Sequence, residues 1–129
     1  MVITSLRLIL AVTVLTSMDD ATLHSLGVSG TTEEQVDRLA RLAKEAGVDG
    51  VVCSPLEAPK MREILGADAT IVTPGVRPTW AATGDQSRIM TPAKALAAGA
   101  SHLVIGRPIT EADDPKQAID KIHAELEIA

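Results

Sequence analysis

Four short apolar runs divide the chain, and each is continuous rather than alternating with polar residues. Continuous runs of aliphatic and β-branched residues are typical of strands buried on both faces, as in parallel sheets covered by helices. The pattern therefore predicts four strands, at Leu8–Thr16, Gly50–Ser54, Ala69–Pro74 and His102–Arg107.

Between and after these runs, the apolar positions change to the spacing of an amphipathic helix. Thr31 and Glu34 have the spacing of a capping box. Pro92 and Pro115 each follow a residue that commonly caps a helix. Helices are thus predicted over 31–47, 54–66, 91–99 and 113–127, and Pro59 predicts a break or an irregular first turn in the second. The apolar faces predicted for the first and last helices are Val36, Leu39, Ala40, Ala43 and Ala46, and Ala118, Ile119, Ile122 and Leu126.

The order of elements is four successive βα units, which predicts an α/β fold with a parallel sheet and right-handed crossovers. No Gly-x-Gly-x-x-Gly turn indicates a doubly wound nucleotide-binding sheet. An eight-unit barrel needs about 250 residues, so the 129 residues suit half of a TIM-type (βα)8 barrel. We expect residues 1–129 to form a single half-barrel domain, with 1–7 as an extra edge element or a non-native leader. Because a half barrel leaves two strand edges unpaired, self-association or a second chain is expected to complete it.

The amino-acid composition mainly excludes several classes of function and site. The chain has no Phe or Tyr, one tryptophan (Trp80) and a net charge of −5, so without a basic stripe or stacking aromatics it is not expected to bind nucleic acid. One cysteine, Cys53, excludes an internal disulfide, and its place in an apolar run indicates a buried structural residue. The three histidines lack ligand spacing, so no metal site is expected. The run after Arg7 is too short to span a membrane and lacks the cleavage pattern of a secretory signal.

Arginine, glycine and glutamine follow the last two predicted strands. Arg77 and Gln86 lie in the long polar stretch after the third run, and Gly106 and Arg107 end the fourth. Parallel βα folds gather their chemistry at the carboxyl ends of the strands. Backbone amides exposed by glycine, together with a guanidinium group, suit a phosphate group. The residues alone leave two interpretations open, a phosphate site or ordinary surface turns.

Five motifs at these positions carry a family resemblance. The strings LTSM, DGVVCS, VTPGVRP, GDQSRIMTP and VIGRPIT resemble the C-terminal half of bacterial-type orotidine 5′-phosphate decarboxylases, from about Leu8 to Leu126. The resemblance implies half of a (βα)8 barrel from a family of cytoplasmic homodimers that need no metal or cofactor. It also implies a site for a nucleotide 5′-monophosphate such as UMP or OMP. The residues implied for that site are Gln86, Gly106 and Arg107 at the phosphate, Arg77 in the same loop region, and Thr16 or its neighbour Ser17 near the nucleotide.

The resemblance also implies an Asp/Lys catalytic array with an Asp-x-Lys-x-x-Asp motif, which this sequence does not contain. The nearest string, Asp114–Asp120, has its last spacing one residue too long and is better explained as a capped, solvated helix. The segment Glu57–Lys60 is likewise expected to be helical and solvent-facing. All five lysines fall within predicted helices, so no catalytic residue is assigned and the chain alone is expected to be inactive. Two alternatives stay open: one half of a two-chain decarboxylase, or an oligomeric scaffold without a ligand.

Overall fold

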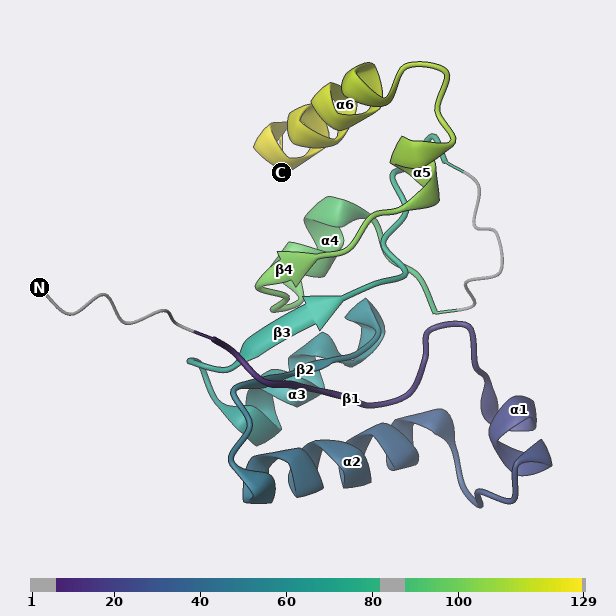
Figure 1. The fold of residues 1–129 in the computed structure, drawn as a ribbon, viewed down its shortest axis with the longest axis vertical. Helices are drawn as coiled ribbons and strands as arrows, with labels where there is room; N and C mark the ends of the chain where they lie inside the picture. The colour runs from purple at the N-terminus through teal and green to yellow at the C-terminus, as the bar shows by residue number, and fades with distance from the viewer. Residues whose placement is uncertain (1–6, 82–87, 129) are drawn as a thin grey trace, which may run out of the picture.

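The computed structural model describes residues 7–81 and 88–128, and its centre is one parallel sheet of four strands. The strands lie in sequence order, β1-β2-β3-β4 (Figure 1). Their register places Ala11 beside Val51 and Val51 beside Ile71. Their bounds are Leu10–Val12 for β1, Gly50–Val52 for β2, Thr70–Thr73 for β3 and His102–Leu103 for β4. All four predicted strands are confirmed, although each is shorter than the apolar run that predicted it.

Helices connect the strands in the expected order. The predicted helices are α2 (Thr32–Ala46), η1 with α3 (Pro55–Glu57 and Ala58–Leu65), α4 (Pro92–Ala97) and α6 (Pro115–Ile128). The irregular first turn predicted from Pro59 is the 3-10 turn η1. Two short helices were not predicted, α1 (Asp20–Ser25) and α5 (Arg107–Thr110). They have too few turns to produce a readable periodicity.

The helix ends show which local signals were reliable. Thr31 and Glu34 form the predicted capping box: Thr31 Oγ1 accepts from the Glu34 amide at 3.1 Å, and Glu34 Oε2 accepts from the Thr31 amide at 2.9 Å. Asp114 Oδ1 accepts from the Gln117 amide at 3.1 Å before α6. Thr91 precedes α4 as predicted, but its side chain makes no capping bond.

The core lies between the helices and one face of the sheet. Val51 and Ile71 on this face, and Val36, Ala40 and Met61 on the helices, are fully buried. Burying a valine, isoleucine or methionine side chain contributes about 1.5–3 kcal/mol, so this layer holds the helices on the sheet. Two residues predicted on apolar helix faces, Ala46 of α2 and Ile119 of α6, are instead exposed.

The other face of the sheet is open. Val12, Val52 and Val72 lie side by side in register across β1, β2 and β3. Val12 is 59% exposed, and Val52 and Val72 are half-buried. Both outer strands, β1 and β4, have one edge that no strand of the described ranges pairs. A parallel sheet is normally covered on both faces, so this arrangement corresponds to part of a barrel wall.

None of the helices in the described part of the chain has the length and apolarity needed to cross a membrane.

Candidate functional site

The loop that joins β3 to α4 begins and ends at the carboxyl edge of the sheet. The Arg77 amide donates to the Met90 carbonyl at 3.0 Å, and the Met90 amide donates to the Gly75 carbonyl at 3.4 Å. Gly75 has a φ of 72°, a left-handed conformation that glycine adopts without strain. The two ends of the loop therefore lie side by side, and their pairing fixes the backbone of Arg77.

Arg77 contributes to a cavity of about 240 Å³ beside this pairing. Arg77 is 7% exposed, and Arg107, which follows β4 at the start of α5, lines the same cavity. The other lining residues are Trp80, Ala81, Pro108, Glu111 and Ala112. The lining includes two arginines and one carboxylate residue, Glu111, so its net charge is positive. Such a cavity can accept an anion with several oxygen atoms.

Arg107 reaches the cavity from the first turn of α5. The Gly106 carbonyl accepts hydrogen bonds from the amides of Ile109 and Thr110 at 2.9 and 3.0 Å, which close the first turn of α5. Gly106 itself is exposed and is not among the residues lining the cavity.

Helix α6 holds the start of the loop in place from the outer side. Thr79 Oγ1 donates to Glu125 Oε1 at 3.1 Å, and Lys121 Nζ lies 5.4 Å from the centroid of the Trp80 ring. A cation at this distance from an indole is attracted by its π face. Trp80 therefore lies between the cavity and α6, where a ligand in the cavity changes its surroundings.

The predicted site residues divide into three groups. Arg77 and Arg107 meet in one cavity, as their positions after neighbouring strands predicted. Thr16 is buried in the segment between β1 and α1 and does not line the cavity, and its neighbour Ser17 is exposed. Gln86 lies outside the described residues, so its predicted contact with phosphate stays a prediction.

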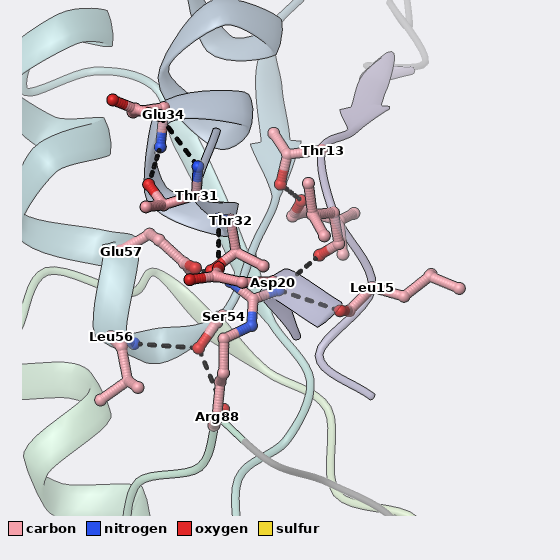
Figure 2. Close-up of polar contacts among 12 residues, drawn as sticks. Thr13, Leu15, Asp20, Thr31, Thr32, Glu34, Ser54, Leu56, Glu57 and Arg88 are labelled. Carbon is pink, nitrogen blue, oxygen red and sulfur yellow. Dashed lines mark hydrogen bonds and ion pairs between the residues drawn. The ribbon is translucent and has the colours of Figure 1, made fainter. Parts of the chain in front are cut away.

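Sequence reasoning missed a buried ion pair at the same edge of the sheet. Arg88 pairs with Glu57, and their side chains are 11% and 8% exposed. Figure 2 shows Arg88 among Leu15, Ser54 and Glu57, residues that follow β1 and β2. The prediction that Glu57 faces solvent is wrong, because η1 turns it inward toward Arg88. The only sequence signal for a buried Glu57 was its apolar neighbours, and these fit the surface of a helix equally well.

Cysteine and lysine, two residue types that often act in catalysis, are not positioned for that role. Burial raises the pKa of the Cys53 thiol to about 12, and the charge of Arg88 only partly opposes this effect. A thiol in that state is a poor nucleophile near neutral pH, which agrees with the structural role predicted for Cys53. All five lysines lie on helices, as predicted: Lys44, Lys60, Lys94, Lys116 and Lys121.

No metal site is evident among residues 7–81 and 88–128, where no three His, Cys, Asp or Glu side chains gather closely enough to hold an ion.

Comparison with known proteins identifies the family. Residues 3–122 match the model of the family described as orotidine 5′-phosphate decarboxylase / HUMPS. The chain belongs to this family.

Curated relatives named orotidine 5′-phosphate decarboxylase agree with this membership. The chain is 59% identical over 118 residues to the protein of Rhodopseudomonas palustris (strain BisB5), and 56% identical over 118 residues to that of Nitrosococcus oceani. These matches cover 92% of this chain but only 50% and 51% of the relatives. The chain therefore spans about half the length of the decarboxylases it matches.

Solved structures show the same relation. The orotidine 5′-phosphate decarboxylase of Lactobacillus acidophilus superposes with a TM-score of 0.72 at 45% identity, covering 91% of this chain and 48% of that one. The enzyme of Pyrococcus horikoshii gives a TM-score of 0.57 at 26% identity and covers 74% and 43%. The four βα units thus form half of a decarboxylase-family barrel, which confirms the predicted fold class.

Proposed function

We propose that this half barrel binds the phosphate group of a nucleotide 5′-monophosphate, such as UMP or OMP, in the cavity between Arg77 and Arg107. The observation that carries the proposal is that these two arginines, from neighbouring βα units, line one small cavity. A guanidinium group donates two parallel hydrogen bonds to phosphate oxygens, and two such groups match the charge of a phosphate dianion. Family membership supplies the substrate class, since the relatives are named for orotidine 5′-phosphate.

The family resemblance adds three further residues to the proposed nucleotide site. Gln86 and Gly106 complete the phosphate contacts, and Thr16 lies toward the nucleoside. Gly106 immediately precedes Arg107, which lines the cavity, so a contact between Gly106 and the phosphate is the easiest of the three to form. Thr16 is buried after β1, whereas the cavity residues follow β3 and β4, so a contact with the nucleotide requires the nucleoside to extend from the cavity across the strand ends.

The proposal includes no turnover by this chain alone. Decarboxylation in the family is expected to need a lysine set among carboxylates, and the sequence contains no Asp-x-Lys-x-x-Asp string. All five lysines lie on helices rather than at strand ends. Without this array, the chain binds the phosphate group, a part of the substrate that does not react. The binding energy of such a group assists the reaction at another part of the substrate.

Fluorescence of Trp80 tests the phosphate site. Trp80 is the chain's one tryptophan and lines the cavity, so its emission reports occupancy directly. Titration with uridine 5′-phosphate is expected to give a saturable change, and titration with uridine is expected to give none. Equal responses to the two compounds, or no response to either, would contradict the proposal.

The open valine face supports a second candidate function, assembly with another half barrel. Val12, Val52 and Val72 form an apolar row that is partly exposed, and β1 and β4 each have an edge that no described strand pairs. Two copies related by a two-fold axis can place β4 of each beside β1 of the other, which pairs both edges in the parallel sense and buries both rows.

A second copy of this chain is therefore the proposed partner, and the distinct half of a two-chain decarboxylase is the alternative. Sedimentation of the purified chain distinguishes them. A particle of twice the 13.5 kDa chain mass supports self-association. A monomer that gains decarboxylase activity when mixed with the N-terminal half of a relative such as that of Rhodopseudomonas palustris supports the two-chain enzyme.

A further inference from the structure

Arg88 joins segments that follow two different strands. Its Nη2 donates to the carbonyl oxygens of Val14 and Leu15 at 3.1 and 2.9 Å, and both residues lie between β1 and α1. Its Nη1 forms the ion pair with Glu57, which lies in η1 after β2. One guanidinium group therefore spans the carboxyl ends of β1 and β2 (Figure 2).

The backbone of Arg88 is held by the same cluster. Ser54 Oγ donates to the Arg88 carbonyl at 3.0 Å and accepts from the Leu56 amide at 3.2 Å. Ser54 is fully buried, so these bonds are shielded from competing water. Both ends of Arg88 are thus fixed to the frame formed by β1, β2 and η1.

Met90 connects this frame to the cavity that Arg77 and Arg107 line. Met90 lies two residues after Arg88, and its carbonyl accepts from the Arg77 amide at 3.0 Å. Val76 and Met90 also pair as a parallel β-bridge. The position of Arg88 therefore sets the position of the strand-like segment that holds Arg77, whose side chain lines the cavity.

We propose that Arg88 is a positioning residue for the anion cavity: its buried side chain anchors residues 88–90 to the ends of β1 and β2, and the Met90–Arg77 pairing transmits this anchor to Arg77. This positioning role depends on the proposed function only for the identity of the anion that Arg77 binds. The mechanical part, that Arg88 orders the backbone of Arg77, holds with or without a ligand.

Arg88 is much more buried than Arg41, an arginine of α2 that also forms an ion pair. Arg41 pairs with Asp37 at 2.9 Å, but its side chain is 59% exposed. An exposed pair contributes little because water screens it, whereas breaking a buried pair is costly. The Arg88 guanidinium has three partners, the Val14 and Leu15 carbonyls after β1 and Glu57 in η1. Burial also lowers the pKa of Arg88, yet arginine stays charged at neutral pH.

Hydrogen exchange in the free protein tests the proposal without any ligand. The Arg77 amide is compared with the Cys53 amide, which donates to the Val72 carbonyl at 3.1 Å within the sheet. Because removing Arg88 alone strands a buried carboxylate and risks unfolding, the variant is Arg88→Met with Glu57→Gln. The matched control is Arg41→Met with Asp37→Asn, which removes the same kinds of charge from an exposed pair.

In the Arg88→Met/Glu57→Gln variant, the Arg77 amide is expected to exchange at least about 10-fold faster than in the parent, while the Cys53 amide changes little. The control is expected to leave both amides unchanged. A purely structural role would accelerate both amides equally, and that result, or an unchanged Arg77 amide, would overturn the proposal. If the double variant does not fold, Arg88→Lys is measured in the same way, because it keeps the charge beside Glu57 but cannot span both segments.

Uridine 5′-phosphate binding then separates this inference from the proposed function. A protein that shows the exchange result but does not bind uridine 5′-phosphate would refute the phosphate site and retain the positioning role. A protein that binds uridine 5′-phosphate equally well with and without Arg88, with Arg77 exchange unchanged, would refute the positioning role and retain the site.

Discussion

Arg77 and Arg107 follow neighbouring strands of the sheet, and their side chains line the same cavity. Arg77 is nearly buried while Arg107 is exposed, so Arg107 is the more accessible of the two from solvent. This division predicts that Arg77 needs a fixed backbone, whereas Arg107 can adjust to an incoming anion.

Replacing either arginine is expected to weaken uridine 5′-phosphate binding. A hydrogen bond to a charged group contributes about 1.5–3 kcal/mol, so Arg77→Ala and Arg107→Ala should each lower affinity about 10- to 100-fold. Calorimetric titration measures the effect, and Arg41→Ala is the control because Arg41 lies on the exposed face of α2. An equal loss in the control would indicate non-specific attraction between the nucleotide and the protein's charge.

The open sheet face is expected to be the contact between two copies. Val12→Lys places a charge at the β1 end of the valine row, beside the proposed contact with the second copy, and should convert a dimer to a monomer, because burying an unpaired charge is costly. Leu42→Lys is the matched control, since Leu42 is equally exposed, at 59%, but lies on the outer surface of α2. Sedimentation velocity measures both variants. Dissociation by Leu42→Lys, or none by Val12→Lys, would place the interface elsewhere.

Cys53 should make stability fall at high pH. Its pKa is about 12 in the folded protein against an ordinary 9.0, so folding favours the protonated thiol. The contribution of Cys53 is therefore complete below about pH 9 and is lost as pH rises from about 9 to 12, by about 1.4 kcal/mol per pH unit.

Urea unfolding of the parent and Cys53→Ala isolates this effect from the titration of lysines. The difference in unfolding free energy between the two proteins should shrink by about 2 kcal/mol between about pH 8 and about pH 10.5. A constant difference would show that the thiolate is solvated in the folded state.

The capping box of α2 should stabilise the fold without affecting the site. Thr31→Ala removes the acceptor for the Glu34 amide and is expected to cost about 1 kcal/mol of unfolding free energy. Thr32→Ala, at the next position, removes no cap and should change stability by less than about 0.5 kcal/mol. Thermal unfolding measures both. A change in nucleotide affinity on Thr31→Ala would mean that α2 influences the cavity directly.

The sequence predicted the elements whose signals are local. The four apolar runs identified the four strands, and the capping box identified the start of α2, because both signals depend on residues close together in the chain. The short helices α1 and α5 escaped because a helix of four to six residues has no periodic face. The five motifs were sufficient to assign the half barrel to its family, and the family match confirms that assignment.

The candidate site was predictable only where strand topology determined it. Arg77 and Arg107 were expected together because the carboxyl ends of adjacent parallel strands share an edge. The pairing of Arg88 with Glu57 was not expected, because the two residues lie far apart in the chain and Glu57 fits the pattern of a solvated helix. Contacts of this kind depend on how loops fold over the sheet, which no spacing rule describes.

The most direct test of the phosphate site is the NMR signal of the arginine side chains during titration with uridine 5′-phosphate. The Nε–H resonances of Arg77 and Arg107 should shift with saturation, while those of Arg38 and Arg41 on α2 stay in place and serve as internal references. Uridine should shift none of them. Shifts confined to the two cavity arginines would establish that this half barrel binds phosphate in the proposed cavity, and shifts spread over all four, or absent from Arg77 and Arg107, would contradict the account.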